Sequence, residues 1–285
     1  MTTQQHSDNY YVPGLSHWPI TAAIAIALLG FGAAFSVNGM SGGTVMLLLG
    51  FLVLFVMFGG WFTTVAHESK SGAYNKQVGM SFRWGMSWFI FSEVMFFAAF
   101  FGVLGYMRMY SVPDLASVDN QLLWPGFSGN WPTAGPHFKP GDFSTINAWG
   151  IPALNTALLL ASGVTITIAH WGLLKKNRAQ LIWGLVATIA LGMVFLGFQI
   201  YEYAYAYSAL NLKLTSGAYG STFFMLTGFH GFHVTVGTIM LWVILFRSVA
   251  GHFTPENHFG FEGVAWYWHF VDVVWVLLFV LVYLL

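Results

Sequence analysis

Glu93 lies in the segment FIFSEVMFFAAFF, residues 89–101, where every other side chain except that of Ser92 is apolar. A carboxylate at the centre of a bilayer costs about 2.5–3.5 kcal/mol on insertion scales. No basic residue lies one helical turn from Glu93 on this segment. We therefore expect either a protonated acid that bonds to a neighbouring helix or a site of proton exchange, and the residues alone favour neither.

Two further pairs of ionisable residues lie in apolar segments. His230 and His233, in GFHGFH, are three residues apart, so they could share one ligand or metal ion, or each could donate to a neighbouring helix. His269 and Asp272, in WYWHFVDVVW, have the same spacing and suit either a structural contact or a proton relay. We expect buried structural roles for all four and keep the metal site and the relay as alternatives.

Two apolar segments carry stripes of small and hydroxyl-bearing residues at helical spacing. The stripes are Thr156, Gly163, Thr167 and His170 in one segment, and Gly228, Gly231, Thr235 and Thr238 in the other. Residues that share a helical face and have small side chains let helices approach closely. Each stripe therefore predicts a packing seam between helices.

The composition is that of an integral membrane protein. Of the 285 residues, 57% are hydrophobic and 7% charged, against about 25% charged in soluble domains. There is no cysteine, which excludes disulfides and thiolate metal sites, and the net charge of zero gives no reason to expect a nucleic-acid partner.

Spanning helices need about 20 mainly apolar residues, and this pattern predicts an all-α membrane protein with seven transmembrane helices. The expected spans are 18–37, 43–65, 81–107, 149–172, 181–205, 219–246 and 260–284. Basic residues near the expected span ends are unevenly divided between the two sides of the membrane. One side has Lys70, Lys76, Arg83, Lys175, Lys176, Arg178 and Arg247, and the other has Arg108, Lys139 and Lys213. The bias predicts a cytoplasmic N-terminus and a C-terminus on the opposite side.

The expected organisation has four parts. Residues 1–16 form a polar N-terminal segment without Lys or Arg, so the first apolar run is expected to be a retained helix rather than a signal peptide. Residues 17–66 hold the first two helices, and residues 67–80 form a cytoplasmic loop. Residues 81–285 hold the other five helices and a long periplasmic loop at about 110–147.

Four blocks of sequence resemble subunit III of the haem–copper cytochrome c oxidases. They are SEVMFF, LLLASGVTITIAHW, YGSTFFMLTGFHGFHVTVG and HFGFEGVAWYWHFVDVVWVLLFVLVYLL, and the resemblance runs from His17 to the C-terminus. The corresponding subunit of the related quinol oxidases typically has five spans. The seven spans expected here therefore resemble the cytochrome c oxidases more than the quinol oxidases. The resemblance implies a first pair of helices splayed from the other five, with a lipid-filled V-shaped cleft between them.

The resemblance also implies a function. It suggests a subunit of a proton-pumping aa3-type oxidase in aerobic respiratory electron transport, with no redox centre, catalytic residue or metal site of its own. Haem a, haem a3, CuA and CuB would lie in partner subunits I and II, with a small subunit IV as a further candidate partner, and cytochrome c would dock on the complex rather than on this chain. The chain would stabilise subunit I, bind phospholipid, support proton uptake and protect the enzyme from turnover inactivation.

Particular residues match the family's functional positions. Glu93 matches its carbodiimide-reactive glutamate, and four residues match its contacts with lipid headgroups: Trp61, Glu68, Arg247 and His252. The chain departs from mitochondrial relatives at Phe62, His67 and around Ala250, which suggests either lipid binding with a weaker charge contribution or a different headgroup preference. The long loop at 110–147 suggests a bacterial chain, and so a bacterial inner membrane.

Two other classes of protein remain as alternatives. A proton-coupled transporter could use Glu93, but such proteins often have internal repeats, and the sequence shows none. A cytochrome b-type protein would need histidines that face each other at bilayer depth, for which His230, His233 and His269 are candidates.

Overall fold

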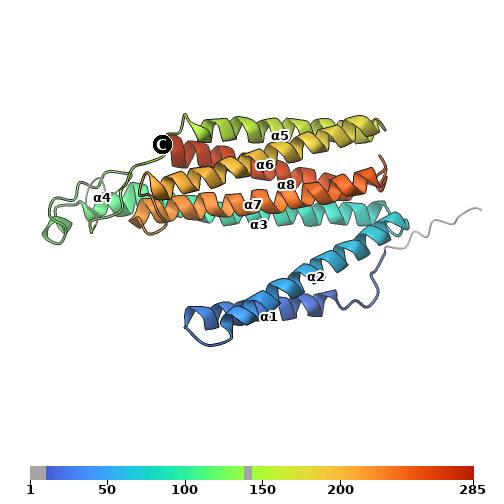
Figure 1. Ribbon diagram of the computed structural model, residues 1–285, viewed down its shortest axis with the longest axis horizontal. Helices are drawn as coiled ribbons and strands as arrows, with labels where there is room; N and C mark the ends of the chain where they lie inside the picture. The colour runs from blue at the N-terminus through green and yellow to red at the C-terminus, as the bar shows by residue number, and fades with distance from the viewer. Residues whose placement is uncertain (1–10, 138–142) are drawn as a thin grey trace, which may run out of the picture. The chain divides into compact units, whose positions relative to one another are not determined.

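The computed structural model describes residues 11–137 and 143–285, and within these residues it is entirely helical. The elements are α1 (Trp18–Val37), α2 (Gly43–Lys70), α3 (Lys76–Tyr106), the π-helical η1 (Met107–Ser111), α4 (Val112–Leu115), the 3-10 turn η2 (Asn120–Leu122), α5 (Ile151–Leu174), α6 (Arg178–Ser208), α7 (Gly217–Val249), α8 (Phe259–Leu278) and the π-helical η3 (Phe279–Leu284). Among the described residues, seven helices are long and apolar enough to cross a membrane, which confirms the predicted fold class (Figure 1). The chain divides into two compact units, Met1–Phe82 and Arg83–Leu285.

In the first unit, α1 and α2 form an antiparallel hairpin held together by close backbone contact. A Cβ atom at Gly43 would lie 2.5 Å from the backbone nitrogen of Ser36, and one at Gly32 would lie 2.7 Å from that of Leu47. Without the two missing methyl groups the helices can pack at this distance. The turn between them includes Gly42, whose φ of +87° favours glycine.

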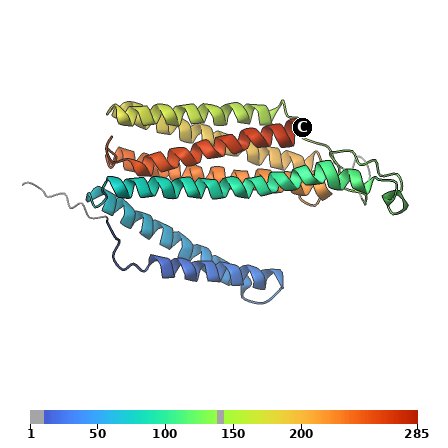
Figure 2. The same ribbon diagram turned by 180° about the vertical axis from the view of Figure 1, so that it is seen from behind.

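In the second unit, α5, α6, α7 and α8 run side by side, and α3 runs beside α7 (Figure 1). Figure 2 shows the same bundle from behind, with α8 in front. The connections from α5 to α6 and from α6 to α7 are short, so neighbouring helices run antiparallel. Hydroxyl groups join them: Thr165 on α5 meets Thr188 on α6 at 2.7 Å, and Tyr203 on α6 meets Thr227 on α7 at 2.6 Å. Trp268 and Trp275 of α8 are fully buried and fill the centre of the bundle.

Several helices extend beyond their expected ends. α2 continues to Lys70 and α3 begins at Lys76, so only residues 71–75 separate them, rather than the predicted loop of 67–80. Helices keep their backbone bonds beyond the hydrocarbon core, where polar side chains reach water, so apolar length underestimates helix length. Residues 1–10 of the polar N-terminal segment, and residues 138–142 of the long loop with Lys139, lie outside the described residues.

Candidate functional site

Glu93 of α3 contacts His233 of α7. Its Oε2 atom lies 2.9 Å from His233 Nε2, and the two side chains are 22% and 10% exposed. Glu93 is thus a partly buried acid that bonds to a neighbouring helix, which was one of the two possibilities left open by the sequence.

The other nitrogen of His233 fixes the chemistry of this contact. Nδ1 lies 2.6 Å from the carbonyl oxygen of Phe229, one helical turn earlier on α7. A carbonyl oxygen can only accept, so Nδ1 carries a hydrogen. Nε2 then either accepts from a protonated Glu93 or, as part of an imidazolium, donates to its carboxylate. In both cases the two side chains share one proton besides the hydrogen on Nδ1, and the pair has no net charge.

Aromatic side chains surround this pair. The ring of Phe97 lies 5.1 Å from that of His233, Phe270 lies 6.3 Å away, and the Tyr267 hydroxyl donates to the backbone carbonyl of His233 at 3.4 Å. Such an apolar environment strengthens a satisfied polar contact and makes an unpaired charge costly. The surroundings therefore favour the paired arrangement, in which neither side chain carries an uncompensated charge.

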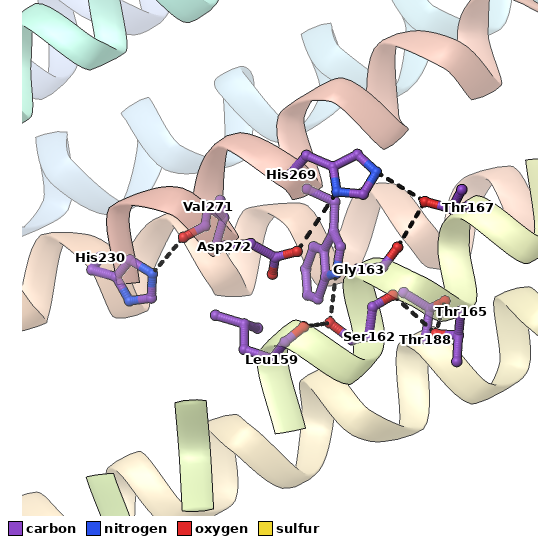
Figure 3. Close-up of polar contacts among 11 residues, drawn as sticks. Leu159, Ser162, Gly163, Thr165, Thr167, Thr188, His230, His269, Val271 and Asp272 are labelled. Carbon is purple, nitrogen blue, oxygen red and sulfur yellow. Dashed lines mark hydrogen bonds and ion pairs between the residues drawn. The ribbon is translucent and has the colours of Figure 1, made fainter. Parts of the chain in front are cut away.

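His269 and Asp272 form a second polar group, at the contact of α8 with α5 (Figure 3). Their Nδ1 and Oδ2 atoms are 3.7 Å apart, which is ion-pair distance but too long for a hydrogen bond. Thr167 Oγ1 donates its one proton to the Gly163 carbonyl at 2.9 Å, so His269 Nε2, 3.3 Å away, must donate to Thr167. Asp272 Oδ1 is buried without a partner among the described residues.

The stripe predicted on α5 is the seam that receives α8. A Cβ atom at Gly163 would overlap Asp272 Oδ2, so only glycine leaves room for this carboxylate. Thr156 accepts a bond from Trp275 Nε1 at 3.0 Å. These contacts confirm the predicted packing seam.

The stripe predicted on α7 is only partly a seam. Nothing lies within 4 Å of a Cβ atom at Gly231 among the described residues, and Thr235 is exposed. α7 instead packs through a neighbouring face, where a Cβ atom at Gly237 would lie 2.9 Å from Trp268. The prediction is wrong at Gly231 and Thr235, because the face of α7 that packs against Trp268 is the one that contains Gly237.

His230 and His233 do not share a ligand. His230 Nε2 donates to the Val271 carbonyl of α8 at 3.2 Å (Figure 3), whereas His233 bonds to α3. Each histidine thus contacts a neighbouring helix, which was the alternative to a shared metal ion. The described ranges contain no group of three or more His, Cys, Asp or Glu side chains that could hold a metal.

An ion pair that the sequence did not predict also joins α3 to α8. Arg83 bonds to both carboxylate oxygens of Glu262, with Nη2–Oε2 at 2.8 Å and Nε–Oε1 at 3.1 Å. Glu262 lies in the first turn of α8, where the helix dipole favours negative charge. The residues are 179 positions apart, so local spacing gave no signal for their contact.

The residues matched to lipid contacts are divided between the two units. In the first unit Trp61 is exposed, and Glu68 accepts a bond from Tyr74 at 2.6 Å. In the second unit the Arg247 guanidinium lies 4.6 Å from the ring centroid of Phe253, and the His252 N–H donates to the Arg247 carbonyl at 3.0 Å.

Comparisons with known proteins identify the family. A sequence model described as cytochrome c oxidase subunit III matches residues 8–285. This chain belongs to the cytochrome c oxidase subunit III family. Cytochrome c oxidase subunit 3 of Marchantia polymorpha is 38% identical over 282 residues, which cover 99% of this chain and 97% of the relative. The subunit 3 proteins of Prototheca wickerhamii and Lemur catta are each 40% identical, over 94% and 99% of this chain and 94% of either relative.

Family membership confirms the resemblance and makes the chain a multi-pass membrane subunit of an oxidoreductase complex. The three relatives come from a plant, an alga and a mammal, so they give no support to the expected bacterial origin. All three are oxidase subunits, and the transporter alternative is not favoured.

Proposed function

We propose that the chain is subunit III of a proton-pumping aa3-type cytochrome c oxidase and has no redox centre of its own. Haem a, haem a3, CuA and CuB would then lie in subunits I and II. Cytochrome c would deliver electrons to that complex rather than to this chain. Family membership supports this proposal, as do His230 and His233, whose ring nitrogens bond to different helices.

The contact between Glu93 and His233 carries the mechanistic part of the proposal. Two groups that share one proton, 2.9 Å apart in an aromatic environment, can hold that proton within the membrane without leaving a net charge there. In our proposal this pair supports proton uptake by subunit I, and the chain stabilises that subunit and protects it during turnover.

A second part of the proposal is phospholipid binding. Arg247 lies in the last turn of α7 beside an aromatic ring, and its Nε atom has no partner among the described residues. A guanidinium suits the phosphate of a headgroup, and an exposed Trp61 suits the membrane interface. The lipid-filled cleft between the first two helices and the other five remains a prediction.

The uneven distribution of basic residues supports a cytoplasmic N-terminus, on the side from which the oxidase would take up protons. Most basic residues near the helix ends, including Lys175, Lys176 and Arg178, follow this orientation. A location in the bacterial inner membrane remains a prediction, which rests on the length of the loop at 110–147.

The test compares Glu93→Gln with a Ser92→Ala control, because Ser92 is exposed and its hydroxyl bonds only within α3. Purified oxidase should keep its haem a spectrum in both variants, and the isolated chain should have no haem. We expect Glu93→Gln alone to slow proton uptake and to shorten the active life during turnover. Wild-type values for both quantities would refute the role given to Glu93, and haem in the isolated chain would refute the role of a subunit without a redox centre.

A further inference from the structure

A set of buried polar side chains in the second unit has atoms that the function proposed above does not use. Asn155 of α5 is 0% exposed, Gln199 and Glu202 of α6 are 5% and 1%, and His230 of α7 is 1%. Each has buried atoms without a hydrogen-bond partner among the described residues. These atoms are Asn155 Nδ2 and Oδ1, Gln199 Oε1, Glu202 Oε2 and His230 Nδ1. Because buried polar atoms in folded proteins are nearly always paired, this concentration requires an explanation.

Direct contacts connect most of this set. Tyr283, in η3 at the end of α8, donates to Glu202 Oε1 at 2.6 Å, and Gln199 Nε2 lies 3.4 Å from the same oxygen. The ring of Trp275 lies 6.0 Å from that of Tyr283 and 5.1 Å from that of His230. The indole of Trp275 therefore lies between His230 and Tyr283, the residue that bonds to Glu202.

The register of α5 against α6 places Asn155 at the same depth. The two helices are antiparallel, and Thr165 meets Thr188 between them. Asn155 lies ten residues before Thr165, and Gln199 lies eleven residues after Thr188. The difference of one residue corresponds to about 1.5 Å along the helices. Asn155 is fully buried, so its amide lies inside the bundle at the level of Gln199.

The unpaired atoms include both donors and acceptors. Asn155 Nδ2 donates, whereas Asn155 Oδ1 and Gln199 Oε1 accept. His230 Nε2 donates to a carbonyl, so the Nδ1 atom of the neutral ring accepts. Glu202 Oε2 accepts when ionised and donates when protonated. A metal ion would be repelled by the Nδ2 hydrogens, and an anion by the oxygen atoms. Water donates two bonds and accepts two, and it matches a mixed set of this kind.

We propose that Asn155, Gln199, Glu202 and His230 enclose an internal water site between α5, α6 and α7, closed by Tyr283 at the end of α8. One water can donate to only two of the three or four acceptor atoms, so we expect more than one water in the site. These waters join the three helices through polar contacts. This inference does not depend on the role proposed for Glu93.

The first test is a structure of the intact, wild-type oxidase at a resolution that shows ordered water. We expect at least one ordered water within about 2.7–3.2 Å of atoms from two or more of the four side chains. Direct bonds between the Asn155 and Gln199 amides, or side chains that fill the site without water, would overturn the proposal.

The second test uses Asn155→Leu, which keeps a similar volume and removes the amide. If water occupies the site, the change removes its partners, and the thermal unfolding midpoint of the subunit within the oxidase should fall by at least about 2 °C. Leu159→Met, one turn further along α5 and equally buried, controls for a change of shape without loss of a polar group. A midpoint equal to or above that of the control would show that the amide had no partner to lose. If Asn155→Leu does not assemble, the wild-type structure decides.

Discussion

His233 Nε2 lies 2.9 Å from Glu93 Oε2, while His233 Nδ1 donates to the Phe229 carbonyl, so the two side chains share one proton. This relationship explains why an acid can lie in a segment as apolar as residues 89–101. The proton can reside on either partner without leaving a net charge in the membrane. The pair therefore avoids the cost of an isolated buried charge.

Glu93→Gln should leave the subunit assembled and abolish labelling by a hydrophobic carbodiimide. The amide has nearly the same shape and can still bond to His233 Nε2, but it lacks the carboxyl group with which the reagent reacts. Mass spectrometry of the labelled subunit measures the result. Undiminished labelling at this position in the variant would show that another residue reacts.

Glu93→Lys should disturb the packing of α3 against α7. The change places a cation beside His233, which is only 10% exposed, and removes the acid that compensates an imidazolium. We expect less subunit III to be retained on the purified oxidase than with Glu93→Gln, measured by quantitative gel analysis. Equal retention of the two variants would argue against a buried site.

His233→Leu should increase the rate of carbodiimide labelling of Glu93 severalfold at neutral pH. Without the imidazole, Glu93 loses its hydrogen bond to His233, and the carboxyl group is free to react with the reagent. His230→Gln is the matched control, because His230 bonds to Val271 and makes no contact with Glu93. A rate that His233→Leu leaves unchanged would mean that the contact with His233 does not limit the reactivity of Glu93.

Patterns within single helices were predicted well from the sequence, and contacts between distant helices were not. The seven spans and the seam on α5 followed from hydropathy and from residues such as Gly163 and Thr167. The partner of Glu93 is 140 positions away and that of Arg83 is 179 positions away, so no local spacing could reveal either.

His230 shows a related limit of reasoning from spacing. Residues three apart on a helix share a broad face, but that face can contact two different helices. His230 and His233 therefore bond to α8 and α3 respectively, instead of to a common ligand. The orientation of each ring depends on the packing of all the helices, which the sequence of one segment does not contain.

Tyr74→Phe should remove a pH-dependent contribution to the stability of the first unit. Burial, and then the hydrogen bond to Glu68, raises the pKa of Tyr74 above its ordinary value of 10.0. Because the folded state holds this proton more tightly than the unfolded state, the contribution is fully present below pH 10 and is lost as the pH rises above it. The difference in unfolding midpoint between wild type and variant should shrink above pH 10. A difference that stays constant across that range would mean that the phenol does not titrate in this way.

Gly163→Ala should destabilise the subunit by about 1–3 kcal/mol, as overpacking of a close contact does. The new methyl group would overlap Asp272 Oδ2 and force α5 away from α8. Gly197→Ala on α6 is the control, because no atom of the described residues lies within 4 Å of its Cβ position, and alanine favours a helix. The thermal unfolding midpoint should fall for the first variant and stay level or rise for the second.

Adding Asp272→Ala to Gly163→Ala separates this clash from a general effect of the methyl group. Truncation of Asp272 removes the overlapping oxygen, so the double variant should be more stable than the sum of the two single effects predicts. Simple additivity would show that the methyl group acts elsewhere on α5. The coupling free energy therefore measures the contact between the side chain at position 163 of α5 and the Asp272 carboxylate of α8. That carboxylate also lies 3.7 Å from His269 Nδ1 on the same helix.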